Sequence, residues 1–189
     1  MGEAPQNQAQ PQGHCRDRAD LHVPSPEWRD QVIYLLMIDR FADGDPSNND
    51  QGMGEFDPRD RSRYSGGDLK GVTGRLDYLQ SLGVTTVWTT PPVANQWWSQ
   101  VAGYGGYHGY WARDFTRIDE HYGTLRDYQD LSCALHRRGM FHVMDIVVNH
   151  TGDFFNYYAT PAADNPADGY RPANPASPTD APMNYPFNL

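Results

Sequence analysis

Cysteines and long apolar runs are scarce in this sequence. The 189 residues contain two cysteines, Cys15 and Cys133, which allow at most one disulfide bridge and exclude a domain built on a disulfide framework. No segment reaches the ~18 consecutive apolar residues of a membrane-spanning helix. The polar start MGEAPQNQAQPQGHCRDRAD also lacks the apolar core of a signal peptide. We therefore expect no membrane partner, and the composition alone does not indicate a compartment.

Positive charge is in the minority. The 15 Lys and Arg residues are scattered among 24 Asp and Glu, which gives a net charge of -9. Nucleic-acid binding needs clustered basic residues to neutralise phosphates, so no nucleic-acid partner is expected. The sequence has no P-loop, CxxC or HExxH motif, and GYGGYHG carries His108 where a dinucleotide fingerprint needs its third glycine. A neutral or cationic partner fits this composition better.

The chain divides into a leader and a patterned region. Residues 1–27 are rich in Gln, Ala, Pro and charge without periodicity, which predicts a flexible leader. Three strand-length apolar runs follow, QVIYLLMI, VTTVWTT and FHVMDIVV, and the continuous first run is typical of a strand buried on both faces. Apolar residues at three- and four-residue spacing between the runs predict two helices, one capped by Asp68 and ended by Gly83, the other capped by Thr124 and ended by Gly139.

The order strand, helix, strand, helix, strand predicts an α/β fold with a parallel sheet and right-handed crossovers. Sheets of this kind carry their chemistry at the carboxyl ends of the strands. The unusual polar residues follow the strands: Asp39 and Arg40 follow the first, a long aromatic loop the second, and Asn149 and His150 the third. We therefore expect these groups to meet at one rim of the sheet.

The aromatic loop contains YHGYW at residues 107–111. Sugar rings offer apolar faces that stack on aromatic rings and hydroxyls that His, Asp and Asn can bind, so this mixture suits a carbohydrate cleft. The alternative is a loop that packs its aromatic residues onto its own scaffold. Residues 107–111 do not decide between the two without neighbouring motifs.

The loop after the first strand contains DGDPSNND, which gathers Asp43, Asp45, Asn48 and Asn49. Hard oxygen ligands at this density suit calcium, and a solvated turn is the alternative. The segment is not an EF-hand, because the sixth position of that pattern is Asn48 and the twelfth is Gly54.

The triplet Asn149-His150-Thr151 matches an N-glycosylation acceptor, but it directly follows a buried strand, which disfavours that interpretation. For His150 the simplest structural alternative is a histidine that bonds a backbone carbonyl.

Five segments in the same order, DQVIYLLMIDRF, GGDLKGV, YHGYWARDF, YGTLRDYQDLSCALHRRGM and DIVVNH, resemble the start of the alpha-amylase family, glycoside hydrolase family 13. The resemblance covers about residues 30–155 and implies retaining chemistry on α-linked glucans within a (β/α)8 TIM barrel. Residues 28–152 would supply its first three strands and two helices, about three βα units. Residues 153–189 would begin an inserted B domain.

The resemblance also implies roles for individual residues. Tyr110 would stack on the sugar at the cleavage site, His108 and His150 would bind its hydroxyls, Trp111 would line the cleft, and Asp145 would help to organise the site. Asn149 would ligate a calcium ion between barrel and B domain. A second calcium, as in the subset similar to cyclodextrin glucanotransferases, would be held by Asp43, Asp45, Asn48, Asn49, Asp68 and the backbone of Gly66.

The sequence departs from the family in one respect. Retaining hydrolysis needs two carboxylates about 5 to 5.5 Å apart, and the family draws them, with a third aspartate, from strands four, five and seven, beyond this chain. Arg117-Ile118-Asp119 resembles the Arg-x-Asp around the family's nucleophile but precedes the third strand, so we reject it. We expect an N-terminal piece of a larger enzyme that is inactive alone. A non-catalytic glucan- or calcium-binding fragment, or a nonfunctional product, is the alternative, and an extracellular or periplasmic location is implied by resemblance only.

Overall fold

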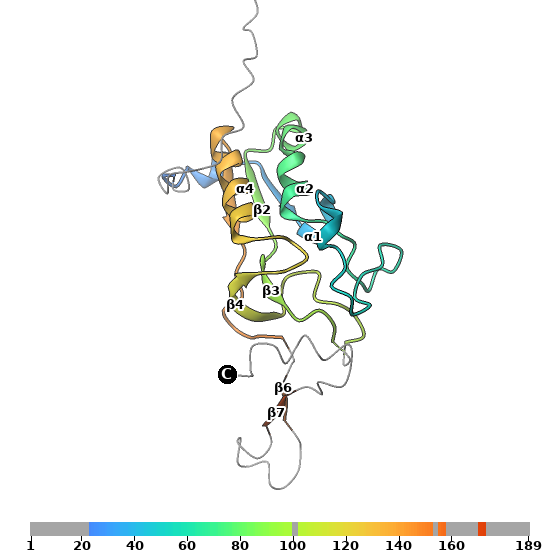
Figure 1. Ribbon diagram of the computed structural model, residues 1–189. Coiled ribbons are helices and arrows are strands. Elements are labelled where there is room, and N and C mark those ends of the chain that lie inside the picture. The colour runs from blue at the N-terminus through green and yellow to red at the C-terminus, as the bar shows by residue number, and fades with distance from the viewer. Residues whose placement is uncertain (1–22, 100–101, 153–154, 158–169, 173–189) are drawn as a thin grey trace, which may run out of the picture.

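The computed structural model describes residues 23–99, 102–152, 155–157 and 170–172. Its centre is a three-stranded parallel sheet in the order β1-β2-β5, formed by β1 (Ile33–Leu36), β2 (Thr86–Thr89) and β5 (Phe141–Met144) (Figure 1). The strands pair in register, so that Leu35 lies beside Trp88 and Trp88 beside Val143. The parallel α/β arrangement predicted from the sequence is confirmed.

The crossover after β1 runs through two short helices instead of the single helix predicted between Asp68 and Gly83. These are α2 (Leu69–Gly74) and α3 (Leu76–Ser81), and the chain leaves helical geometry at Arg75, where φ is −112° and ψ is 12°. The α2 segment LKGVTG contains two glycines, each of which disfavours a helix by about 1 kcal/mol relative to alanine. The predicted cap is confirmed, because the Asp68 side chain accepts a hydrogen bond from the Gly71 amide.

The second crossover contains α4 (Leu125–Arg137), which begins and ends close to the predicted residues. Thr124 caps it in a reciprocal arrangement with Asp127, in which the Thr124 hydroxyl accepts from the Asp127 amide and the Asp127 carboxylate accepts from the Thr124 amide. Leu131 and Leu135 are buried, while Leu125 in the first turn is 60% exposed.

The prediction of one long aromatic loop after β2 is wrong in part, because this segment contains an antiparallel hairpin. Strands β3 (Val93–Asn95) and β4 (Ala112–Ile118) pair with register shifts at Val93/Ala94 and Ala94/Asn95. These irregularities disrupt the alternation of apolar and polar residues from which a strand pair is predicted. The smaller elements are η2 (Trp28–Asp30), α1 (Ile38–Phe41), η3 (Pro46–Asn48), β6 (Phe155–Tyr157) and β7 (Tyr170–Pro172).

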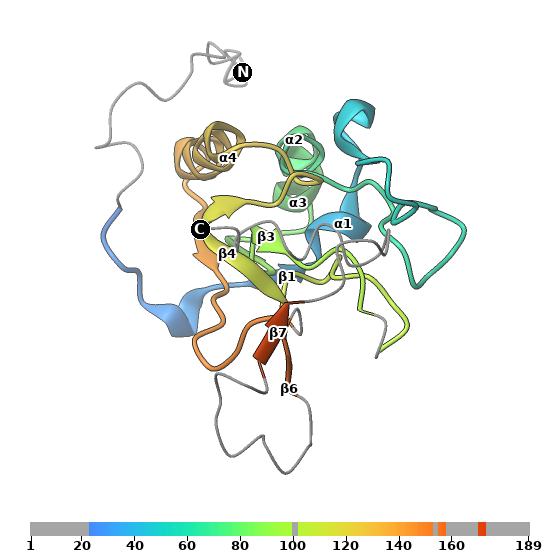
Figure 2. The ribbon, with the colours of Figure 1, turned by 60° about the horizontal axis from the view of Figure 1, so that its bottom comes forward.

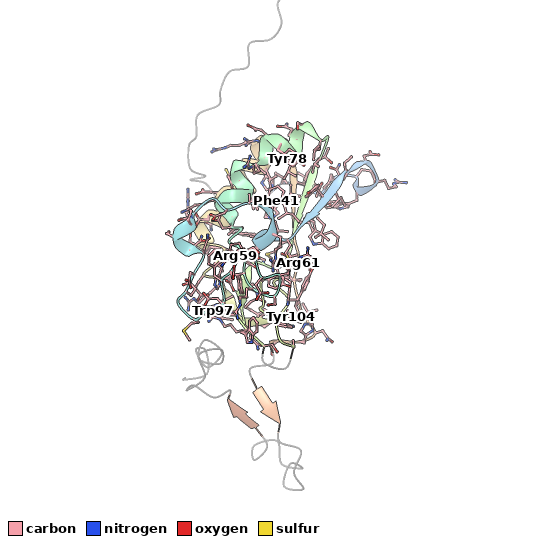
Figure 3. The ribbon with its side chains drawn as sticks, turned by 90° about the vertical axis from the view of Figure 1, so that its right-hand side faces the viewer. Phe41, Arg59, Arg61, Tyr78, Trp97 and Tyr104 are labelled. Carbon is pink, nitrogen blue, oxygen red and sulfur yellow. The ribbon has the colours of Figure 1, made fainter. Side chains whose placement is uncertain are left out.

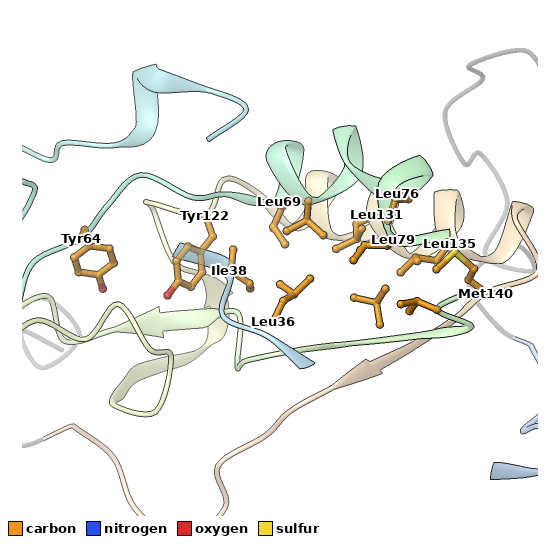
Figure 4. Packing of buried hydrophobic residues seen from close by; sticks show 13 residues of the cluster. Leu36, Ile38, Tyr64, Leu69, Leu76, Leu79, Tyr122, Leu131, Leu135 and Met140 are labelled. Atoms are coloured by element: carbon orange, nitrogen blue, oxygen red, sulfur yellow. The ribbon is translucent and has the colours of Figure 1, made fainter. Parts of the chain in front are cut away.

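One face of the sheet carries the core. Helices α2, α3 and α4 lie along this side (Figure 2). Leucines from these helices pack against Leu36 and Val87 of the strands, with Tyr64 and Tyr122 at one end of the cluster and Met140 at the other (Figure 4). The helical contribution is Leu69, Val72, Leu76, Leu79, Leu131 and Leu135, all fully buried.

The opposite face of the sheet is apolar and open in the described structure. Ile33 is 46% exposed, Leu35 54% and Trp88 36%. The first apolar run was predicted to be buried on both faces, and that prediction is wrong for the described residues, because the helices cover one face only. An apolar sheet face of this kind needs a covering layer. None of the helices in the described part of the chain has the length and apolar composition that crossing a bilayer requires.

Candidate functional site

The tight turn in YHGYW depends on Gly109. Its φ is +88°, and a Cβ built there would lie 2.3 Å from the Pro91 carbonyl oxygen. Only glycine combines this backbone conformation with so close an approach. The turn places the His108 and Tyr110 rings in a near-parallel stack, with centroids 5.8 Å apart and planes at 19°, and directs the edge of His108 against Trp111 at 4.6 Å.

Tyr110 joins the aromatic loop to the end of β5. Its hydroxyl donates to Asp145 Oδ2 over 2.8 Å, and its carbonyl accepts from His150 Nε2 over 3.1 Å. Burial together with the Asp145 hydrogen bond raises the pKa of Tyr110 to about 12. His108 stacks on Tyr110 and meets Trp111 with its ring edge. The structure therefore brings the predicted sugar residues of the aromatic loop together with those that follow β5.

The hydrogen bonds fix the tautomers of both histidines. The Tyr110 amide donates to His108 Nδ1 over 3.0 Å, so Nδ1 is unprotonated and the proton of the neutral ring resides on Nε2. That Nε2 is buried and has no hydrogen-bond partner among the described residues. Burial lowers the pKa of His108 to about 4, which keeps the ring neutral near pH 7. His108 thus presents an unused N–H donor. In His150 the Nε2 proton bonds the Tyr110 carbonyl, so this histidine has a backbone carbonyl as its partner in the structure.

Sequence reasoning missed two residues that hold this site. Tyr104 packs on Trp111 with ring centroids 4.7 Å apart. Asn95 of β3 accepts the Trp111 amide on its Oδ1 over 2.7 Å and accepts Arg113 Nε on its carbonyl over 2.9 Å. The tyrosine lies in the aromatic segment that drew attention, but the asparagine gave no signal because its role depends on the unpredicted hairpin. We call Tyr104, His108, Tyr110 and Trp111 the aromatic platform.

The predicted calcium residues after β1 cluster in space. Asn49 Nδ2 donates to Asp43 Oδ2 over 2.7 Å. The same side chain lies directly against Gly66, where an added Cβ would be 2.7 Å from Asn49 Nδ2. Asp68 Oδ2 accepts the Asp45 amide over 2.7 Å, which joins Asp68 to the loop that contains the other predicted ligands. Burial raises the pKa of Asp68.

Two buried oxygens in this cluster lack partners. Asn48 Oδ1 and Asn49 Oδ1 are buried and form no hydrogen bond within the described part of the chain. Such orphaned carbonyl oxygens are hard ligands of the kind that calcium takes. The Asp45 carboxylate is paired with Lys70 Nζ at 2.5 Å, which lowers its pKa to about 2. The donor set therefore fits calcium, with Lys70 as a competing cation at Asp45.

The remaining metal prediction, Asn149, lies apart from this cluster. Its side chain is exposed, and its Nδ2 is 3.4 Å from His150 Nδ1. No group of three or more His, Cys, Asp or Glu side chains poised for a metal occurs in the described ranges. A calcium site built from the described residues therefore depends on amide and carbonyl oxygens as well as carboxylates. The predicted start of the B domain at residues 153–189 and most of the predicted leader lie outside the described residues, apart from the backbone of the paired β6 and β7.

Asp119, rejected above as a nucleophile, is fully buried in a charged triad. Its Oδ1 accepts His121 Nδ1 over 2.8 Å, and His121 Nε2 lies 3.2 Å from Glu55 Oε1. Burial alone would lower the pKa of His121, but the hydrogen bonds and charges of Asp119 and Glu55 outweigh it and raise that pKa to about 9. For Glu55 burial would raise the pKa, but the bonds from His121 and the Gln51 amide lower it to about 2. The triad is thus an imidazolium between two carboxylates.

Comparison with known proteins identifies the family. The family model described as "Alpha amylase, catalytic domain" matches residues 35–188, and the chain belongs to the alpha-amylase family of glycoside hydrolases, as its motifs indicated. Among relatives, the cyclomaltodextrin glucanotransferase of Klebsiella oxytoca is 47% identical over 128 residues, which are 66% of this chain and 20% of that protein. The periplasmic alpha-amylase of Escherichia coli is 36% identical over 154 residues, covering 72% of this chain and 21% of that protein.

Solved structures give the same result. An alpha-amylase from Anoxybacillus is 42% identical, with a TM-score of 0.60, and covers 76% of this chain and 28% of that one. An alpha-amylase from Geobacillus thermoleovorans complexed with acarbose is 38% identical, with a TM-score of 0.54, and covers 76% of this chain and 27% of that one. The chain therefore spans about a quarter of the length of these relatives, and its fold corresponds to part of their TIM-barrel catalytic domain.

Proposed function

We propose that this chain supplies the sugar-binding rim and a calcium loop of a retaining hydrolase or transglycosylase that acts on α-1,4-glucans. The observation that carries the proposal is the aromatic platform. In it a buried His108 N–H donor, which has no partner among the described residues, lies against the Tyr110 ring, and the Tyr110 hydroxyl bonds the Asp145 carboxylate. An apolar ring with a donor and an acceptor at its margin matches the alternation of C–H faces and hydroxyls on a glucose unit.

The groups of the platform have distinct parts in this proposal. The exposed side of Tyr110 stacks on the sugar, His108 Nε2–H donates to a sugar hydroxyl, and Trp111 forms the adjoining wall. Asp145 holds the Tyr110 ring by accepting its phenol proton. His150 has its Nε2 proton on the Tyr110 carbonyl and binds sugar only if it leaves that bond. These are binding roles, and no step of bond cleavage is assigned to them.

The open apolar face of the sheet supports the view that further strands complete the catalytic domain. Ile33, Leu35 and Trp88 lie where a closed barrel has its interior. In the proposal the nucleophile and the acid/base carboxylate come from strands beyond the third, and this chain alone does not cleave glucan. A glucan hydrolysis rate from the pure chain that vanished on replacing one of its own acids would contradict this part. The alternative, a non-catalytic glucan binder, rests on the same platform.

Sugar binding by the platform is testable on the chain itself. We expect maltoheptaose to bind with a dissociation constant of about 1 mM, because one wall of a cleft forms few contacts. Tyr110→Ala should weaken binding about tenfold by removing the stacking surface, equivalent to ~1.4 kcal/mol. The measurement is a maltoheptaose titration followed by NMR chemical shifts.

The matched control for the sugar test is Tyr78→Ala. Tyr78 is 52% exposed on α3, at the opposite end of the molecule from Tyr104 of the platform (Figure 3). It should leave maltoheptaose affinity unchanged. Equal affinities for the Tyr110→Ala variant and the unchanged chain would remove the platform from sugar binding. A micromolar affinity of the unchanged chain would favour the binding-module alternative.

Calcium binding at the loop after β1 is the second part of the proposal. Asp43, Asp45, Asn48, Asn49, Asp68 and the Gly66 carbonyl would hold the ion, and the two orphaned amide oxygens support this assignment. Calcium bound there would neutralise the charge of the carboxylates and would stabilise the loop. Asn149 is proposed as a ligand of a separate calcium ion next to the B domain, and this assignment rests on the family resemblance alone.

The test of the calcium loop is thermal unfolding with and without calcium. Saturation at 100 times the dissociation constant should stabilise the chain by about 2.7 kcal/mol, and EGTA should reverse it. Asp43→Asn should reduce the effect strongly, since it removes a charged ligand. The control is Asp50→Asn, in an exposed acid of the same loop whose Oδ1 accepts the Gly52 amide and no other donor within the described residues; it should retain the effect. An identical response from both variants would contradict the assignment.

A further inference from the structure

The buried triad joins the calcium loop to the hairpin of the aromatic platform. Glu55 is 2% exposed, while His121 and Asp119 are fully buried. The imidazole is clamped on its faces and edges as well, because Tyr64 stacks on it at a centroid distance of 3.8 Å and Trp97 meets it edge-on at 5.3 Å. A ring held in this way cannot move unless Glu55 or Asp119 moves with it.

Hydrogen bonds lead from Glu55 to the calcium loop. Its carboxylate accepts the amide of Gln51 on Oε1 and the amide of Met53 on Oε2 over 2.9 Å. The side chain of Gln51 in turn donates from Nε2 to the carbonyl of Asn48 over 2.8 Å. Asn48 is one of the residues with an orphaned buried oxygen, so Glu55 holds the segment that ends in the calcium cluster.

Hydrogen bonds lead from Asp119 to the platform. Its Oδ2 accepts the Asn95 amide over 2.7 Å, and the Asn95 side chain accepts the Trp111 amide over 2.7 Å. Asp119 also donates its own amide to the Pro92 carbonyl over 2.9 Å, and Pro92 follows Pro91, whose carbonyl lies against Gly109. The triad thus fixes both strands of the hairpin from which the platform projects.

We propose that His121 is a positioning residue that couples the two halves of the site, so that calcium in the loop after β1 strengthens glucan binding at the aromatic platform. His121 contacts neither ligand. The coupling runs through Asn48, Gln51, Glu55, His121, Asp119, Asn95 and Trp111, and it rests on the proposed function because it presumes both ligands. Coupling of binding sites is reciprocal, so glucan also strengthens calcium binding.

The structure explains why this coupling passes through a charged residue. Neutral chains of hydrogen bonds can yield at each member, but an imidazolium between two carboxylates resists separation from both in a buried setting. Calcium that orders Asn48 therefore restrains Glu55, and through His121 it restrains Asp119 and the hairpin. A neutral side chain at position 121 can donate to one of the two carboxylates at most, so the connection between Glu55 and Asp119 is broken.

The experiment measures the dissociation constant of maltoheptaose by NMR, with saturating calcium and with EGTA, on the full 189-residue chain. We expect calcium to tighten maltoheptaose binding at least about fivefold, and to shift the Trp111 amide resonance without any sugar present. His121→Gln should bind each ligand but bring the factor to about 1 and abolish the Trp111 shift. The control is His142→Gln. His142 is a partly buried histidine on β5 that has Thr89 Oγ1 at 3.3 Å, and no carboxylate hydrogen-bonds it within the described part of the chain. This variant should keep the factor.

Each outcome is distinguishable. If the unchanged chain binds neither ligand, the proposed function fails and the coupling with it. If it binds both with a factor of 1, the coupling is overturned while the proposed function stands. A His121→Gln variant that keeps the full factor also overturns it. Should His121→Gln fail to fold, Glu55→Gln gives the same test, because it retains the shape of the side chain while removing the charge that holds the imidazolium.

Discussion

The Asp119→Ala variant is expected to lose about 3 to 5 kcal/mol of unfolding free energy, the range for breaking a buried ion pair. The substitution removes the partner of the His121 imidazolium and strands three donors: the Asn95 amide, the His121 amide and His121 Nδ1. Urea unfolding followed by tryptophan fluorescence measures the loss.

The control for that substitution is Asp114→Ala on β4. In the part of the chain that the structure describes, the hydrogen bonds to Asp114 Oδ1 are local ones from the Thr116 amide and hydroxyl, so its removal should cost about 1 kcal/mol or less. Equal midpoints for the two variants would contradict the structural role of Asp119. Asp119→Asn provides a further check, because full stability together with a lost glucan hydrolysis rate would restore Asp119 as a catalytic group.

The second large effect is a loss of stability at alkaline pH. The pKa of His121 is about 9 in the folded protein against ~6.5 unfolded, so the folded state binds more protons between these values. The stabilisation from His121 is complete below about pH 6.5 and is lost as pH rises through about 9. Its size is on the order of a few kcal/mol. Urea midpoints measured from pH 7 to 9.5 should fall steadily.

Other groups change stability outside that window. Burial lowers the pKa of His108 and of His142 to about 4, so their effect is lost as pH falls from about 6.5 to 4. Burial raises the pKa of Asp39 to about 6, so the stability that this group contributes is present below its unfolded pKa of about 4 and is lost as pH rises through about 6. The groups that face His121 are Glu55, Asp119, the Tyr64 ring and, at longer range, Asp39. His121→Gln should flatten the curve between pH 7 and 9; an unchanged slope would contradict the assignment.

The sequence predicted those parts of the fold that depend on local pattern. The Thr124 cap, the end of α4 near Gly139 and the three strands all follow from residue periodicity and capping chemistry. It did not predict the break at Arg75, because a continuous apolar stripe over Leu76 and Leu79 hides a local change of backbone. Nor did it predict β3 and β4, whose irregular pairing destroys the period of two.

For the candidate site, the sequence singled out the residues now proposed to bind sugar, but not the residues that support them. His108 and Tyr110 stand out as imidazole and aromatic groups in the loop after the second predicted strand, and the family resemblance implied the roles of these two residues and of Asp145. Asn95 and His121 do not, since an asparagine and a histidine in polar segments are common. Their importance comes from burial and from partners more than 15 residues away, which no local pattern encodes.

The register of the central sheet has a kinetic consequence. Ile33 pairs with Thr86, and Thr86 with Phe141, so each pairing joins strands more than fifty residues apart. Long loops must close before these contacts form, which makes such sheets slow to assemble. During that time the stretch around Leu35 is an extended apolar segment with unpaired backbone groups. A newly made chain is then an expected client for chaperones that bind such segments, and refolding yield should depend on protein concentration.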